Sequence, residues 1–208
     1  ARSGAMGDVG VAVSPDANSI HWNAAKLAFA KDNVGLALNY TPWLRNLVPD
    51  ISLSYLSFYK KIDDLQAFGA SLRYFSLGDI TFTNINGEQI ATYRPNEFAI
   101  DGAYSRKLSD NFSIGVALRY VYSNLAAGLD QNQQTIPGQS FAGDISAYYV
   151  QPAEVFGKKG EIAFGANISN LGAKIAYTES GNANFLPTNL RLGGSVKSQI
   201  DDYNSITF

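Results

Sequence analysis

The sequence contains no cysteine and a single histidine in 208 residues. The absence of cysteine excludes a disulfide-stabilised scaffold and thiolate metal sites. No run of about 18 consecutive apolar residues occurs, which is the length that a membrane-crossing helix needs, so a transmembrane helix is excluded. The formal net charge of −2 gives no electrostatic basis for binding nucleic acid, and we expect no such partner.

Residues that could carry out catalysis are also scarce. His21 has no cysteine and no pair of carboxylates near it in the sequence, so a catalytic or metal-binding role lacks the partners that it would need. Gly4, Gly7 and Gly10 suggest a phosphate-binding loop, but the preceding strand and the following Gly-Lys-Ser/Thr are missing. We therefore predict no catalytic residues, no metal ligands, no cofactor and no enzymatic activity.

What the sequence does have is alternation of apolar residues with small or polar ones, most clearly in residues 112–122. One set is Phe112, Ile114, Val116, Leu118, Tyr120 and Tyr122, and the other is Ser113, Gly115, Ala117, Arg119 and Val121. Because a strand places successive side chains on opposite faces, this pattern predicts strands with one apolar face. That face would be core in a soluble sandwich, whereas in an outer-membrane barrel it faces lipid and the other face lines the lumen.

The lengths of the connections favour the barrel. Strands are expected at about residues 34–41, 51–60, 65–77, 98–107, 112–123, 141–151, 161–169 and 188–198. Short turns are expected at Asp63-Asp64, Ser109-Asp110-Asn111, Gly157-Lys158-Lys159-Gly160 and Asp201-Asp202, and long connections at about residues 78–97, 124–140 and 170–187. Alternation of short turns with long loops is typical of an antiparallel up-and-down transmembrane β-barrel, with its turns in the periplasm and its loops outside.

The first 32 residues lack the strand pattern. Ser14-Pro15-Asp16 offers a helix start, and residues 23–30 have a high helix propensity. We therefore expect residues 1–32 to form a short helical plug in the mouth of the barrel. Residues 33–208 are expected to supply the barrel strands of an all-β protein.

Several stretches resemble a known family. Residues 1–10, 16–19 and 21–28 closely resemble the N-terminal signature of the PorV family, which comprises outer-membrane barrels of the Bacteroidetes type IX secretion system related to the FadL fatty-acid transporters. Asn167–Gly172 and Leu186–Gly193 also resemble motifs of that family. The resemblance implies a FadL-like barrel of about fourteen strands, of which about eight and the start of a ninth at residues 205–208 are present. We therefore expect the chain to continue beyond Phe208.

The resemblance also implies a role in protein export across the bacterial outer membrane. Proteins of this family are expected to dock beside a large translocon barrel similar to SprA and to accept secreted cargo through its C-terminal signal domain. They would then deliver the cargo to the attachment complex that contains the PorU sortase, while outer-membrane lipid surrounds the barrel. The alternative is a FadL-like channel for small hydrophobic molecules.

Two of the long connections carry apolar residues that could bind a protein partner. Residues 124–140 have a single charge, Asp130. Residues 78–97 include the turn dipeptide Asn86-Gly87, which predicts a hairpin. Long loops of this kind are either functional or disordered. Exposed apolar side chains in them can form a small binding hot spot. The predicted partner-binding residues are Phe82, Ile85, Tyr93, Leu125, Leu129 and Ile136.

Overall fold

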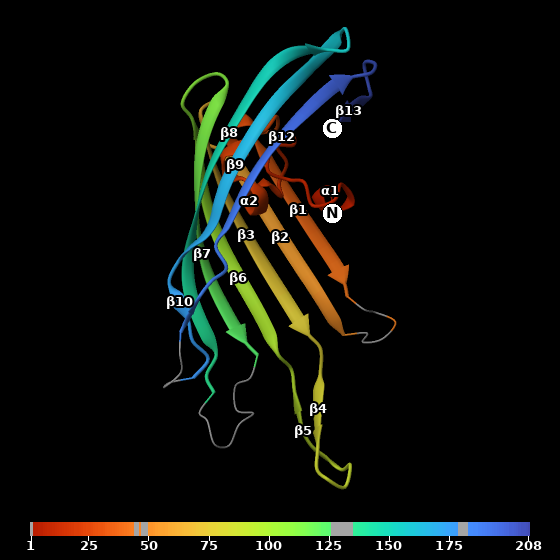
Figure 1. The fold of residues 1–208 in the computed structure, drawn as a ribbon, viewed down its shortest axis with the longest axis vertical. Coiled ribbons are helices and arrows are strands. Elements are labelled where there is room, and N and C mark those ends of the chain that lie inside the picture. Colours follow the sequence, from red (N-terminus) through yellow and green to blue (C-terminus); the bar gives the residue numbers. More distant parts are fainter. Residues whose placement is uncertain (1, 44–45, 47–49, 126–134, 179–182) are drawn as a thin grey trace.

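A computed structural model describes residues 2–43, 46, 50–125, 135–178 and 183–208. Its main feature is a single nine-stranded sheet in which every strand pairs antiparallel with its neighbours (Figure 1). In spatial order the strands are β1 (Val34–Pro42), β2 (Ile51–Lys61), β3 (Gln66–Leu77), β6 (Asn96–Lys107), β7 (Phe112–Asn124), β8 (Gly138–Val155), β9 (Lys158–Gly172), β12 (Asn189–Gln199) and β13 (Ser205–Thr207). This up-and-down order confirms the eight predicted strands and the start of a ninth.

The two faces of the sheet differ as the alternation predicts. On β7, Leu118 is 74% exposed on the outer face, whereas its neighbour Ala117 is 2% exposed on the inner face. On β1, Leu36 and Leu38 are also largely exposed on the outside. Burying apolar surface is the main driving force of folding in water, so an outer face of this composition needs an apolar surrounding.

The connections divide between the two ends of the sheet. The short turns lie at one end, and the long connections extend from the other (Figure 1). The predicted turn at residues 157–160 was wrong in its position: the turn consists of Phe156 and Gly157, both with positive φ, and Lys158 already belongs to β9. Two consecutive residues with positive φ make the tight hairpin turn that matches the twist of the strands.

The long connections contain short strands of their own. β4 (Ile80–Thr83) and β5 (Gln89–Tyr93) form a two-stranded ribbon, and β10 (Lys174–Ile175) pairs with β11 (Asn184–Phe185). The predicted hairpin is confirmed, with Gly87 at φ 82° in its turn. Figure 1 shows the β4–β5 ribbon projecting beyond the end of the main sheet.

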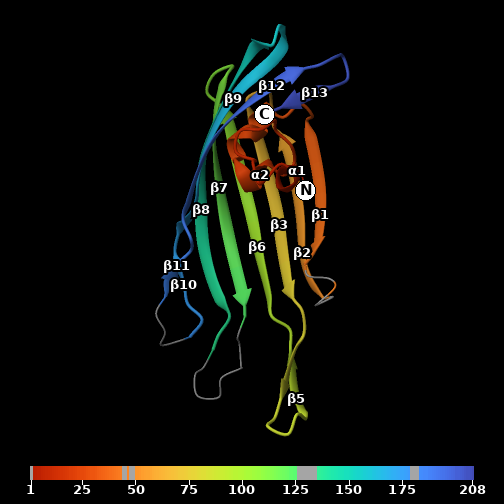
Figure 2. The same ribbon diagram turned by 45° about the vertical axis from the view of Figure 1, so that its right-hand side comes forward.

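The N-terminal segment, residues 2–32, occupies the concave side of the sheet (Figure 2). It contains α1 (Arg2–Ala5), α2 (Ser19–Trp22) and the 3-10 helix η1 (Ala24–Phe29). The segment supplies buried apolar residues such as Ile20 and Leu27, which pack on inward-facing small residues of the strands such as Ala103 and Ala117. None of the described helices is long and apolar enough to cross a membrane. The proposed domain boundary at residue 32 remains a prediction.

Polar contacts also join this segment to the strands. The Asn23 side chain donates to the backbone oxygens of Val11 and Ala147, both at 2.9 Å, and accepts from the backbone N–H of Ala25. Ser113 on β7 donates to the carbonyl of Ala25 at 2.7 Å. Small inward side chains let the two backbones approach closely, so the segment is held by hydrogen bonds as well as by packing.

Candidate functional site

A network of buried charges crosses the inner face of the sheet next to the N-terminal segment. Arg119 on β7 donates to Asp101 on β6 at 2.5 Å and to Asp144 on β8 at 3.0 Å. Nη1 of Arg119 also donates to the side-chain oxygen of Asn170 at 2.6 Å, and Ser71 donates to Asp101 at 2.8 Å. Both carboxylates are nearly inaccessible to solvent. Buried charges are stable only when they are paired and hydrogen-bonded, and this network satisfies that requirement.

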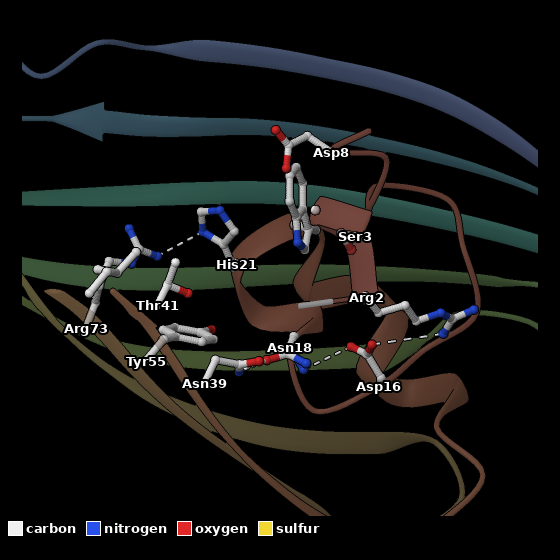
Figure 3. Close-up of a pocket in the computed structure, with 13 residues that line it drawn as sticks. Arg2, Ser3, Asp8, Asp16, Asn18, His21, Asn39, Thr41, Tyr55 and Arg73 are labelled. Carbon is white, nitrogen blue, oxygen red and sulfur yellow. Dashed lines mark hydrogen bonds and ion pairs between the residues drawn. The ribbon is translucent and has the colours of Figure 1, made fainter. Parts of the chain in front are cut away.

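Two further arginines project into the same space without a carboxylate partner among the described residues. Arg73 on β3 donates to Nδ1 of His21 at 2.8 Å, and its guanidinium lies 5.5 Å from the centre of the Tyr55 ring (Figure 3). Arg191 on β12 lies 5.3 Å from the centre of the Trp22 ring. Each guanidinium is therefore held mainly by aromatic contacts.

His21 stays neutral in this setting. Burial, together with the positive charges of Arg73, Arg191 and Arg119, lowers its pKa to about 3. A guanidinium can only donate hydrogen bonds, so Nδ1 accepts from Arg73 and Nε2 carries the proton. His21 thus accepts a hydrogen bond from Arg73 at Nδ1, and its Nε2–H is a donor on the opposite edge of the ring.

A buried lysine fixes the loop in front of α2. Lys26 is 1% exposed, and its ammonium donates to the backbone oxygens of Gly10 at 2.6 Å and Val13 at 3.2 Å. Burial lowers its pKa to about 8. The contacts are all internal, so Lys26 has a structural role in shaping the N-terminal segment.

The arginines line a cavity of about 490 Å³ that opens toward the long connections. Its inner part is formed by His21, Arg73 and Arg191. The remaining wall is mixed: its apolar part comes from Trp43, Leu53, Phe75, Phe98, Val121 and Leu186, and its polar part from Glu97, Arg119, Asp144, Ser169 and Asn170. A second cavity of about 200 Å³ lies between α1, α2 and the first strands, next to Asp16 and Asn39 (Figure 3). Cavities of the larger size, with a few polar groups in an apolar wall, are typical of small-molecule sites.

The predicted partner-binding residues lie away from this cavity, at the end of the long connections. Ile85 is fully exposed in the turn of the β4–β5 ribbon, and Phe82 is half-buried in β4. Tyr93 in β5 donates from its hydroxyl to the Asn124 side chain at 2.7 Å, which ties the ribbon to the end of β7. Whether these residues bind a partner remains a prediction.

The second predicted loop is described only at its ends. Leu125 is half-buried directly after β7, and Leu129 lies outside the described residues. Ile136 is half-buried, and its backbone N–H donates to the carbonyl of Tyr177 at 2.9 Å. The structure therefore brings Tyr93 and Leu125 together at the end of β7 and places Ile136 beside the connection between β9 and β12.

Sequence reasoning did not identify the charge network or the cavity. The available signal was that Arg73, Arg119 and Arg191 all fall on the inward-facing set of their strands, as do Asp101 and Asp144. Among the described residues, no group of three His, Cys, Asp or Glu side chains is placed to hold a metal ion.

The fold and the internal segment together define a class of protein. The sheet is a curved antiparallel meander with an exposed apolar outer face and a polar inner face, and a helical segment lies inside it. This is the architecture of the wall of an outer-membrane β-barrel. A comparison with protein families identifies the member: the model for the type IX secretion system protein PorV matches residues 1–208, the whole chain. The chain belongs to the PorV family. A comparison with curated proteins found no match. This family is a component of the type IX secretion system.

Proposed function

We propose that this protein works in the bacterial outer membrane as a non-enzymatic carrier of the type IX secretion system. In this role it docks beside a large translocon barrel similar to SprA and accepts secreted proteins by their C-terminal signal domain. It then passes them to the attachment complex that contains the PorU sortase. The observation that carries the proposal is the match of the entire chain to the PorV family.

The outer face of the sheet supports a membrane location. Leu38, Leu118 and Leu192 are each at least 70% exposed and come from three different strands, so the apolar surface extends across the wall. Such a surface is unfavourable in water and is matched by the hydrocarbon of a bilayer. The long connections would then face the outside of the cell, and the short turns would face the periplasm.

The β4–β5 ribbon is the best-described part of the proposed partner surface. An ion pair at its base joins Arg94 to Asp79 at 2.5 Å, and the carboxylate of Asp50 accepts from the backbone N–H of Asp79. The same pairing lowers the pKa of Asp79. Beyond this base the ribbon presents Ile85 and Ile90 to solvent, with Glu88 as its only charged residue. A projecting apolar tip on an anchored base suits contact with another protein.

Replacing residues 80–93 by Asn-Gly tests this surface, because Asp79 and Arg94 remain to close the shortened connection. We expect the variant to insert normally, judged by heat-modifiable mobility in gels, but to lose secretion of signal-bearing proteins and co-purification of the translocon. The double variant Ile85→Glu/Ile90→Glu should have the same effect with less disturbance. Phe156→Asn, which removes an exposed apolar residue at the opposite end, serves as the control.

Normal secretion and normal co-purification in both ribbon variants would refute the assignment of this surface. Co-purification of a small hydrophobic molecule, with no protein partner, would instead favour the alternative function as a channel for such molecules. The cavity of about 490 Å³ is the observation that keeps this alternative in view.

A further inference from the structure

The outer face of the sheet carries a pair of positive charges at the end of the short turns. On β2, β3, β6 and β7, which the structure describes in full, the outward positions hold two charged side chains, Lys60 and Arg106. Both are exposed, whereas the residues before them, Tyr59 and Ser105, are buried on the inner face. Each cation is the last but one residue of its strand, so both lie where the apolar outer face ends.

The register of the strands places the two cations on either side of β3. Lys60 lies opposite Phe68, and Phe68 lies opposite Tyr104 on β6. Arg106 lies opposite Gln66, one outward position further toward the short turns. Neighbouring strands are about 4.8 Å apart, so the two backbones are separated by about 10 Å across the sheet. Side chains as long as lysine and arginine can both reach a group that lies between them.

Neither cation is neutralised by the protein. Among the described residues, Lys60 and Arg106 take part in no ion pair. Asp63 accepts from the backbone N–H of Leu65 and from the side chain of Gln66, both at 2.8 Å. These hydrogen bonds and, to a smaller extent, the charge of Arg106 lower the pKa of Asp63. Asp63 belongs to the short turn after β2, so the outer face beyond the two cations has no carboxylate on these strands.

A shallow apolar depression begins next to the two cations. Along β3, Phe68 and Leu72 are 45% and 42% exposed, and between them Ala70 lies opposite Gly102 on β6. A Cβ atom at Gly102 would meet no other atom within 4 Å, so the surface there is open. The six residues from Gln66 to Leu72 span about 20 Å, or about 15 Å along the membrane normal at a tilt of about 40°. This is half the thickness of the hydrocarbon core and thus the reach of one acyl chain.

We propose that Lys60 and Arg106 bind the phosphate of an anionic glycerophospholipid in the leaflet that faces the periplasm. One acyl chain of this lipid lies over Ala70 and Gly102. Cations at the membrane interface cost little stability and attract anionic head groups, whereas the outward residues at the opposite ends of these strands are uncharged. The site rests on the proposed membrane location and orientation, and it does not depend on the secretion role.

The cysteine-free sequence allows a fluorophore to be attached at one chosen position. The full-length protein is labelled at Leu72→Cys, beside the proposed acyl chain, or at Leu192→Cys, which is 70% exposed on the distant strand β12. It is placed in phosphatidylcholine vesicles that contain phosphatidylglycerol or phosphatidylcholine with a nitroxide near the end of one chain. At Leu72 the phosphatidylglycerol should half-quench the label at a mole fraction at least about 5-fold lower, the preference that one interfacial cation provides. At Leu192 the two lipids should quench equally.

Two kinds of variant separate the head group from the chain. Lys60→Gln/Arg106→Gln should remove the preference for phosphatidylglycerol at Leu72. The matched control Lys31→Gln/Lys159→Gln removes the same charge from exposed lysines outside this surface and should keep the preference. Gly102→Leu fills the depression without changing the charge and should reduce quenching by phosphatidylglycerol. Heat-modifiable mobility in gels shows that each variant is folded.

Equal quenching by the two lipids at Leu72 would overturn the proposal, as would the same preference at Leu72 and Leu192. A preference that survives Lys60→Gln/Arg106→Gln would also overturn it. If that variant keeps the preference but loses co-purification of the translocon, the cations bind an acidic protein and not a lipid. Absence of quenching by either lipid at either position would refute the membrane location itself, so failure of the proposed function is distinguishable from failure of the lipid site.

Discussion

Removal of the central arginine of the buried network should be the most damaging single change to the sheet. Within the part of the chain that the structure describes, Arg119 is the only cation that forms an ion pair with Asp101 and Asp144, which are 1% and 5% exposed. Arg119→Met keeps a long apolar stem but leaves two carboxylates buried next to each other without compensation. Breaking a buried pair in this way costs about 3–5 kcal/mol, because the remaining charge cannot be solvated.

The same network predicts that removing one of the carboxylates destabilises the protein less than removing the arginine. Asp101→Asn leaves Arg119 paired with Asp144 as a neutral unit, and the amide oxygen still accepts from the guanidinium. We expect a cost of about 1 kcal/mol, the usual net value of a hydrogen bond. The triple variant Arg119→Met/Asp101→Asn/Asp144→Asn removes all three charges and should recover much of the loss seen in Arg119→Met alone.

The assay is urea unfolding of the protein in vesicles, followed by the fluorescence of Trp22 and Trp43, with the free energy of unfolding compared among the four proteins. The reasoning depends on the order of the effects. It is refuted if Asp101→Asn costs as much as Arg119→Met, or if Arg119→Met costs less than about 1 kcal/mol.

Three other expectations concern the membrane, the orientation and the titration of His21. Leu118→Arg at mid-strand should lower the stability of the inserted protein by about 2–4 kcal/mol, whereas Leu108→Arg in a short turn should cost about 0–1 kcal/mol, as measured by vesicle unfolding; equal costs would argue against a lipid-facing band. A cysteine at Ile85 should react with an impermeant thiol reagent on intact cells, and a cysteine at Asp64 or Asp110 should not; the reverse pattern would invert the proposed orientation. Because the pKa of His21 is lowered to about 3 in the folded protein, the unfolded chain binds the extra proton below about pH 6.5, so stability should fall as the pH falls. Between about pH 7 and pH 5 the loss should be about 1–2 kcal/mol larger for the unmodified protein than for His21→Gln, in urea titrations at each pH, and an equal loss would contradict the assignment.

The strands were predictable because their faces have different surroundings. Alternation on β7 separates Leu118 from Ala117, and the structure exposes the first and buries the second. The length of β8 was not predictable from alternation: it begins at Gly138 and continues past Pro152, where the pattern is weak. The turn at Phe156 was missed because a phenylalanine with positive φ carries no sequence signal for it.

The candidate site was only partly predictable. Asp101 and Arg119 are directly opposite each other on β6 and β7, and the short turn between those strands fixes their register, so this pair could have been inferred by counting from the turn. Asp144 lies on β8, and the long connection between β7 and β8 does not fix the register of these two strands, so its place beside Arg119 could not be inferred in this way. The contacts of Arg73 with His21 and of Arg191 with Trp22 depend on how the N-terminal segment sits inside the sheet, which no local pattern specifies.

The packing of the N-terminal segment has a consequence for the order of events during folding. Asn23 bonds to Ala147, which is 124 residues away along the chain, and Ser195 on β12 bonds to Ala12 across 183 residues. Contacts between residues so distant in sequence form slowly, because much of the intervening chain must be arranged first. The opening residues cannot reach their final surroundings until β12 has joined the sheet. The N-terminal segment is therefore among the last parts to reach its native position. Before that, the folding sheet passes through a stage in which its polar inner face is not yet covered by this segment.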